Sequence, residues 1–272
     1  MLSACSTLQL AYNHSDDFLY WWVNSYVSLQ DTQKPLVRQS LKDLQTWHKA
    51  DQLPQYIALL QRLQHMAPNH ISAAQVCTVT HEMQSSFVTL LRRIEPAATQ
   101  LAMSLKPEQL AHLRQRYDTT NQDWRDEWLT PNAEDRLKHR YKLSLNRLED
   151  FYGKLDAPQR EWVRQWLMQS KFDPEQSYAE RERRQADSVQ TLQRISASKD
   201  ATANQALLRG WVDRSLNSPN ERTRAYAQAL WQDNCEGFAK LHNSTTPAQR
   251  ERLARTLKNY EADLRAVMAT QP

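Results

Sequence analysis

Apolar residues recur along the chain at the three-to-four-residue spacing of an α-helix. In the stretch 247–269, for example, Leu253, Leu257, Tyr260 and Leu264 fall on one face. A break or kink is expected at Pro96, because its ring removes a backbone hydrogen bond. The pattern predicts helices over 12–28, 32–49, 53–67, 72–94, 97–104, 107–128, 131–152, 157–170, 174–197, 201–216, 219–242 and 247–269. We therefore expect an all-α protein, a single elongated domain of about 10 to 12 helices packed antiparallel.

Composition narrows the function classes. The 272 residues include only three glycines, whereas average usage is about 7%. Turn-rich β folds and phosphate-binding loops both need glycine, and neither a G-x-G-x-x-G nor a Walker loop can be written in this sequence. The net charge of +4 is small and its acids and bases are interspersed, so we expect no nucleic-acid partner. No apolar run approaches the roughly 20 residues of a membrane span.

The first residues carry a short motif. Leu2, Ser3, Ala4 and Cys5 fit a bacterial lipobox, in which the cysteine is acylated and becomes the first residue of the mature protein. Residues 1–5 would then be the remnant of a lipoprotein signal, 6–30 an aromatic N-terminal helix and 31–272 the helical body. The alternative is a cytoplasmic protein that starts at Met1 and carries an ordinary cysteine.

The stretch 18–27 is the most apolar patch of the chain. It contains Tyr20, Trp21 and Trp22, which are candidate partner-binding residues because Trp and Tyr are favoured where one end of a side chain is apolar and the other wet. The alternative is an ordinary core helix. We expect the Trp–Tyr face to be mostly buried against the helical body, leaving the polar residues that precede it nearest the membrane.

A five-residue pattern recurs at the predicted helix starts: an apolar residue, a short spacer that usually contains proline, and a glutamine four residues on. Thr246 can cap its helix, Pro247 suits the first helical position, and Gln249 can reach back to close a capping box. The pattern indicates helix starts, and it is also similar to the Leu-Thr-x-x-Gln motif of small helical periplasmic stress chaperones. Its copies are 29–33, 105–109, 155–159, 172–176 and, with Thr in the apolar position, 245–249.

Three cysteines are present. If Cys5 is acylated in an oxidising compartment, Cys77 and Cys235 can form one disulfide. In a cytosolic protein they would instead be two buried free thiols. No C-x-x-C motif is present, which argues against redox catalysis and against a zinc ribbon.

No catalytic constellation stands out. His81 and Glu82 begin like a zinc-protease motif, but Ser85 occupies the place of the second histidine ligand. No G-x-S-x-G is present. We therefore expect no enzyme, no metal and no cofactor, and a hydrolase is the least favoured hypothesis.

The chain as a whole resembles a family of Gram-negative bacterial lipoproteins described only as a domain of unknown function. The resemblance implies export, acylation at Cys5 and a helical periplasmic body, and Ser6 after the cysteine implies the outer membrane. The resemblance rests on the residues Cys5, Ala11-Tyr12-Asn13, Leu19-Tyr20-Trp21-Trp22, Gln75-Val76-Cys77, Pro107-Glu108-Gln109-Leu110, Asp150-Phe151-Tyr152-Gly153, Phe172-Asp173-Pro174, Asn234-Cys235 and His242 to Gln249.

These observations lead to two main hypotheses. The first is a lipid-anchored protein on the periplasmic face of the outer membrane that binds proteins as a chaperone-like or envelope-stress accessory module. The second is a structural or scaffolding lipoprotein that docks on an outer-membrane complex through its aromatic helix. In both, the membrane is reached through the acyl anchor only.

Overall fold

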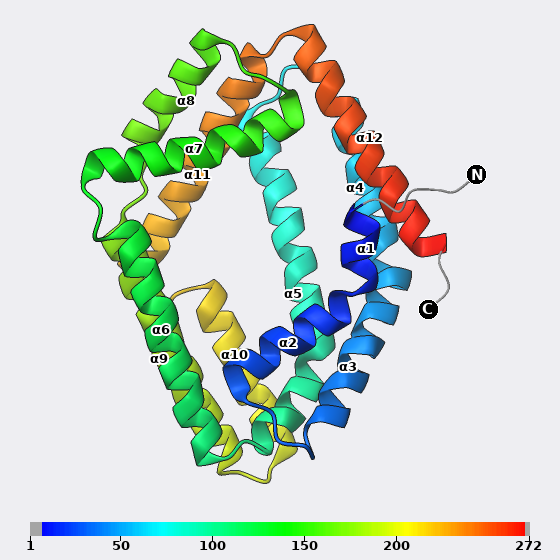
Figure 1. Ribbon diagram of the computed structural model, residues 1–272, viewed down its shortest axis with the longest axis vertical. Helices are drawn as coiled ribbons and strands as arrows, with labels where there is room; N and C mark the ends of the chain where they lie inside the picture. The colour runs from blue at the N-terminus through cyan, green and yellow to red at the C-terminus, as the bar shows by residue number, and fades with distance from the viewer. Residues whose placement is uncertain (1–6, 270–272) are drawn as a thin grey trace.

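A computed structural model describes residues 7–269, and every regular element in that range is helical, as expected (Figure 1). The α-helices are α1 Thr7–Asn13, α2 Ser15–Val27, α3 Lys34–Trp47, α4 Leu53–Met66, α5 Ala73–Met103, α6 Pro107–Trp128, α7 Ala133–Tyr152, α8 Ala157–Gln169, α9 Pro174–Ser196, α10 Ala201–Leu216, α11 Glu221–Ser244 and α12 Pro247–Ala269. A π-helical segment, η1 His48–Gln52, joins α3 to α4. The all-α fold class is confirmed.

Two predicted helix boundaries near prolines are wrong. The predicted gap between 49 and 53 is filled by η1, so that α3, η1 and α4 form one continuous run. Pro54 has no N–H to donate, and the wider π turn accommodates this because the Leu53 N–H bonds to the His48 carbonyl instead. Likewise α5 continues through Pro96, because Glu95 and Thr99 on either side of it are buried against neighbouring helices.

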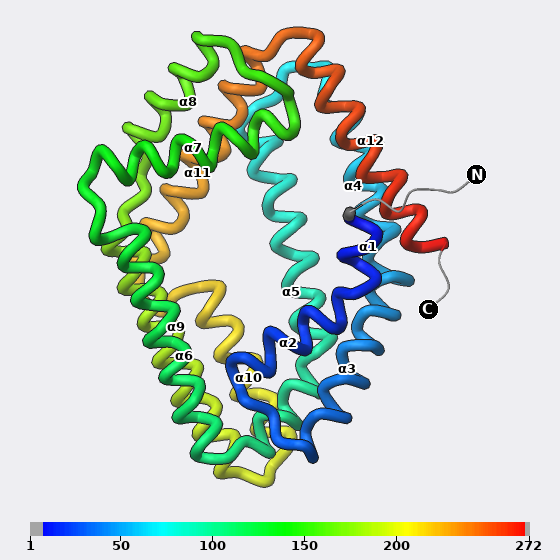
Figure 2. Tube along the Cα trace, viewed as in Figure 1, coloured from blue at the N-terminus to red at the C-terminus, as the bar shows by residue number. Residues whose placement is uncertain are grey.

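The helices follow the outline of an elongated ring when viewed down the shortest axis (Figure 1). Along one side α12 packs on α4, and along the other α6 packs on α9. α5 runs lengthwise and contacts α11 in its first part and α10 in its last. The trace in Figure 2 brings the first and last helices together, and there Gln9 donates a hydrogen bond to Asp263 over 3.2 Å.

Reciprocal glutamine pairs join helix starts at both ends of the ring. At one end Gln159 and Gln249, which begin α8 and α12, donate to each other's side-chain oxygens over 2.8 Å. At the other end Gln33 and Gln109, which precede α3 and begin α6, do the same over 3.1 and 2.8 Å. All four belong to copies of the pattern seen in the sequence. Each of these glutamines also accepts the backbone N–H three residues before it.

The fifth copy differs. Gln176 bonds only within its own turn, to the capping carboxylate of Asp173. Helix starts were therefore predicted correctly from this pattern, whereas the pairing of two starts through their glutamines was not.

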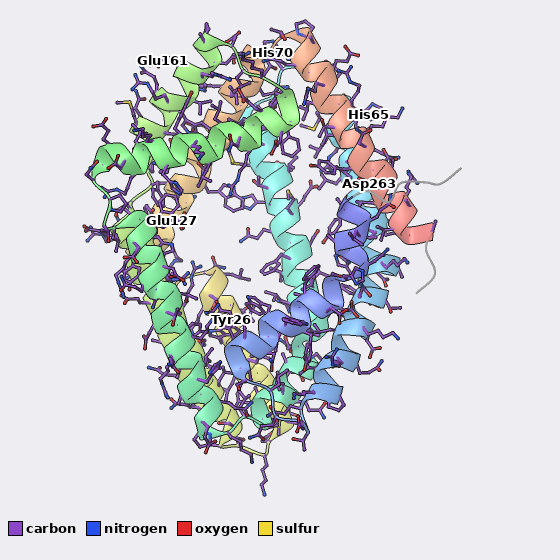
Figure 3. All side chains as sticks on the ribbon, viewed as in Figure 1. Tyr26, His65, His70, Glu127, Glu161 and Asp263 are labelled. Carbon is purple, nitrogen blue, oxygen red and sulfur yellow. A yellow bond between two sulfur atoms is a disulfide. The ribbon has the colours of Figure 1, made fainter. Side chains whose placement is uncertain are left out.

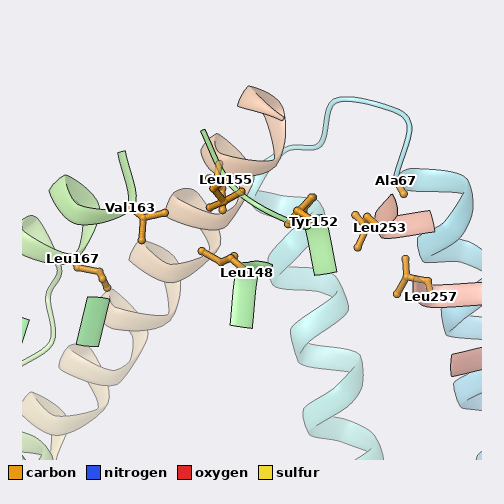
Figure 4. Close-up of a cluster of buried hydrophobic side chains, with 9 residues drawn as sticks. Ala67, Leu148, Tyr152, Leu155, Val163, Leu167, Leu253 and Leu257 are labelled. Atoms are coloured by element: carbon orange, nitrogen blue, oxygen red, sulfur yellow. The ribbon is translucent and has the colours of Figure 1, made fainter. Parts of the chain in front are cut away.

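The largest buried apolar cluster lies in the end of the ring formed by α7, α8, α11 and α12 (Figure 4). Tyr152, Leu155 and Val163 are fully buried in it. Charged side chains such as Glu127, Glu161 and Asp263 lie on α6, α8 and α12 (Figure 3). The end of the ring that holds the buried cluster also contains the cavity described next.

Candidate functional site

A cavity of about 940 Å³ lies between α4, α5, α7, α11 and α12. Each helix turns a face of large apolar side chains towards it, as helical periodicity places them. Representative lining residues are Leu60, Leu63, Val79, Leu148, Phe238 and Leu257. Ligand sites are typically concave, mostly apolar and about 300–1,000 Å³ in volume. The size and lining of this cavity therefore match a binding site for an apolar ligand.

Two buried polar groups in the cavity wall, His242 and Tyr152, are hydrogen-bonded, whereas the indole N–H groups of Trp166 and Trp231 are buried without a partner among residues 7–269. His242 is buried, and its Nε2–H donates to the Asn69 carbonyl over 2.9 Å. Its Nδ1 therefore accepts the hydroxyl proton of Tyr152, over 2.8 Å. Burial lowers the pKa of His242 and raises that of Tyr152, so both side chains are neutral at pH 7. These two groups contribute no charge to the wall.

The loop between α4 and α5 contributes Ala67 and Ile71 to the cavity lining. The side chain of Asn243 accepts the Ile71 N–H and donates to the Ile71 carbonyl, both over 2.9 Å, as a neighbouring strand would. Arg250 donates to the Pro68 carbonyl over 3.1 Å. These bonds hold the loop against α11 and α12.

The predicted disulfide is confirmed. Cys77 of α5 and Cys235 of α11 are joined, with their Cα atoms 5.5 Å apart. Cys235 is buried and lines the cavity. Nearby, His81 of α5 stacks on Trp231 of α11 with ring centroids 4.9 Å apart. Two walls of the cavity are thus fixed relative to each other by a covalent bond and a ring contact.

Trp166 of α8 forms another part of the wall, and it lies directly against Gly237 of α11. A Cβ atom at position 237 would lie only 1.9 Å from the Trp166 ring, far inside van der Waals contact. Glycine is required here because it lets the indole cross the backbone of α11.

The mouth of the cavity combines apolar and cationic side chains. Met83 lines the cavity and is 58% exposed, and Phe87, one turn further along α5, is 52% exposed. Arg147 of α7 is also exposed and is the one charged side chain among the described residues that line the cavity. Within the described part of the chain it has neither a hydrogen bond nor an ion pair. The exposed part of the lining therefore includes both an apolar track and a free guanidinium.

The predicted partner-binding residues of α2 do not share one environment. Tyr20 is buried, and the guanidinium of Arg38 lies over its ring at 3.8 Å. Trp21 and Trp22 are 74% and 60% exposed, and Phe18 is exposed beside them. The expectation that the Trp–Tyr face is mostly buried is thus wrong for both tryptophans. α2 is apolar on two sides, and only the side with Tyr20 packs against α3.

Comparison with known proteins identifies a family. Residues 25–220 match a family described as "Family of unknown function (DUF6279)". The chain belongs to this family. No curated protein and no solved structure matches it. Membership of a family of unknown function was the sequence-level expectation and is confirmed, whereas the lipoprotein character of the family stays a prediction.

Three further expectations concern the membrane and metals. Cys5, the predicted lipidation site, lies outside the described residues. Among residues 7–269, no helix combines the length and apolarity needed to cross a membrane. Over the same range, His, Cys, Asp and Glu side chains form no group that could hold a metal ion.

The cavity is what sequence reasoning missed in this family member. Its lining residues come from helices far apart in the chain, and each was recognised only as part of an apolar helix face. A helical apolar face has the same spacing whether it meets a neighbour or an open space. The one local signal was Gly237, a glycine inside a strongly helical stretch of a chain poor in glycine.

Proposed function

We propose that this protein binds an apolar ligand in the cavity between α4, α5, α7, α11 and α12. The observation that carries the proposal is the cavity itself, about 940 Å³ of space with largely apolar walls. The free energy of the system falls when an apolar ligand replaces the water that lies against such walls. The cross-links between the walls favour binding further, because a pre-formed site loses little conformational entropy when it is filled.

The chaperone-like hypothesis is one form of this proposal, with apolar side chains of a client protein entering the cavity while the client's backbone stays outside it. The exposed Met83 and Phe87 support it, since flexible and aromatic side chains adapt to varied apolar surfaces. The proposal also retains acylation at Cys5, which would hold the protein on the periplasmic face of the outer membrane. Intact-mass analysis of the protein from its native envelope tests the acylation.

A titration with the neutral fluorescent probe N-phenyl-1-naphthylamine tests the binding proposal. The full-length chain should enhance the probe's emission in a saturable manner. Replacing Val79 by Phe narrows the cavity and should weaken probe binding. Val88→Phe makes the same change on α5 at a position that does not line the cavity, and should bind as the unmodified chain does. Thermal unfolding of both variants checks that they are folded. Absence of saturable binding by the unmodified chain would refute the proposal.

A second candidate function rests on the exposed side of α2. Trp21 and Trp22 project a large aromatic surface, and tryptophan is enriched among the residues that dominate binding energy at protein interfaces. We propose that this side docks on a protein partner, as the scaffolding hypothesis requires. Replacing both by Ala should abolish cross-linking to one stoichiometric partner in the native envelope, whereas Met268→Ala, at an exposed apolar position of α12, should not. Equal cross-linking by both variants would exclude α2 as the docking side.

A further inference from the structure

We infer that the cavity binds a single long acyl chain whose anionic head group pairs with Arg147. This inference rests on the proposed function and specifies its ligand. It names a chemical class, an unbranched hydrocarbon chain with one terminal carboxylate or phosphate, which could be a free fatty acid or a lysophospholipid.

The first argument concerns hydrogen bonds in the wall. The hydroxyl of Tyr152 bonds to His242, and that of Thr80 bonds to backbone carbonyls of its own helix. The second nitrogen of His242 is engaged by Asn69. The indole N–H groups of Trp166 and Trp231 are the buried donors of the lining that have no partner in the described part of the chain. An extended polypeptide inside the cavity could offer two carbonyls to them, but most of its N–H and C=O groups would still lack partners, which strongly disfavours burial. An acyl chain has no such groups along its length, so these walls suit it better.

The second argument concerns length. The lining extends from Leu59 and Tyr260 on one side to Trp231 and Met83 on the other. Beyond Met83 the apolar surface continues on the outside of α5 to Phe87. A compact apolar molecule would leave part of this surface in water. A long, flexible chain can cover it along its whole extent.

The third argument concerns charge. Arg147 lies at the exposed part of the lining with no ion-pair partner among the described residues. Other arginines near this end are engaged: Arg62 pairs with Glu82, and Arg250 with backbone carbonyls. The guanidinium is suited to bidentate pairing with a carboxylate or a phosphate. A head group at the mouth could meet Arg147 while its chain stays inside.

The test is competition against N-phenyl-1-naphthylamine, using palmitate, lysophosphatidylglycerol and the neutral hexadecanol below their aggregation concentrations. Palmitate and hexadecanol should both displace the probe from the full-length chain. Arg147→Gln should weaken palmitate about two- to five-fold, the range for a solvent-exposed ion pair, and leave hexadecanol unchanged. Lys142→Gln removes a charge from the same helix away from the cavity and should change neither. If lysophosphatidylglycerol competes and shows the same dependence on Arg147, the class includes lipid head groups; if only palmitate does, it is restricted to fatty acids.

A second measurement locates the chain. Dibrominated stearate quenches tryptophan emission at short range, so bound ligand should quench Trp166 and Trp231. Replacing both by Phe should remove most of the quenching, and undiminished quenching would show that the chain lies elsewhere.

The outcomes separate this inference from the proposed function. Saturable probe binding that no acyl compound displaces, or that only an apolar peptide displaces, would overturn the acyl-chain assignment while the binding function stands. Equal palmitate affinity in the Arg147→Gln and Lys142→Gln variants would overturn the role of Arg147. Absence of probe binding would refute the proposed function.

Discussion

Replacing Gln159 by Ala should destabilise the protein far more than a lost helix cap would. The Gln159 side chain is almost fully buried where the start of α8 meets the start of α12. It accepts the Asp156 N–H over 3.0 Å and donates to the Ser244 carbonyl over 3.1 Å. It also exchanges two hydrogen bonds with Gln249, each 2.8 Å long. The substitution removes one link within α8 and several between α8 and the α11–α12 connection.

The magnitude follows from these bonds. Loss of a capping interaction costs about 1 kcal/mol. Each lost side-chain hydrogen bond costs a further 1 kcal/mol or so, and more where a buried partner is left unsatisfied. The free energy of unfolding should therefore fall by about 2–4 kcal/mol. The matched control is Gln176→Ala, because Gln176 also lies at the third position of its helix but bonds only to Asp173. Its loss should cost about 1 kcal/mol or less.

Urea unfolding of the oxidised full-length chain, followed by circular dichroism, measures both values. A double-mutant cycle between Gln159 and Gln249 isolates the contribution of the pair. We expect a coupling energy of about 1 kcal/mol or more, since the residues are in direct contact. A coupling energy within about 0.3 kcal/mol of zero, or equal costs for Gln159→Ala and Gln176→Ala, would show that capping alone accounts for the pattern.

Three further predictions concern the walls of the cavity. Replacing Cys77 and Cys235 by Ser opens a loop of 158 residues and should lower the free energy of unfolding by about 2–5 kcal/mol, seen as a lower urea midpoint; an unchanged midpoint would contradict this. Gly237→Ala forces a Cβ into an indole ring and should destabilise by about 1–3 kcal/mol, whereas Gly210→Ala meets only the flexible end of an arginine and should stabilise by up to about 1 kcal/mol; shifts of the same sign would contradict the assignment. Because burial lowers the pKa of His242, the unfolded chain takes up a proton below about pH 6.5 while the folded chain does not, so stability is lost as the pH falls from 7 to 5. The urea midpoint of the His242→Gln variant should fall less over this range, and parallel curves would refute the role of His242.

The helices could be predicted closely wherever local chemistry fixes their ends. The observed bounds 107–128, 201–216 and 247–269 are those expected from the sequence. In each case a polar capping residue or a proline at the first helical position marks the start. The errors at Pro54 and Pro96 have the opposite origin. Proline disfavours a continuous helix locally, but the packing of residues on both sides of it over-rides that preference.

The candidate site could be predicted only in part. The cysteine count was sufficient to pair Cys77 with Cys235 under the assumption of export. The exposure of Trp21 and Trp22 could not be deduced, because the side of α2 with Tyr20 is apolar as well and periodicity does not say which side meets the body. The glutamine pattern indicated capping, but the pairing of copies depends on which helix ends meet in space.

The cavity and the polar cross-links around it have a common physical explanation. Apolar walls separated by water tend to close on each other, because contact removes apolar surface from solvent. A cavity of this size therefore needs a frame that keeps its walls apart. The Cys77–Cys235 bond ties α5 to α11, the Gln159–Gln249 pair ties α8 to α12, and Asn243 holds the α4–α5 loop. These links are made by a few side chains and leave most of the lining side chains free for a ligand. A disulfide and polar side-chain links thus supply the rigidity that a filled apolar core would otherwise provide.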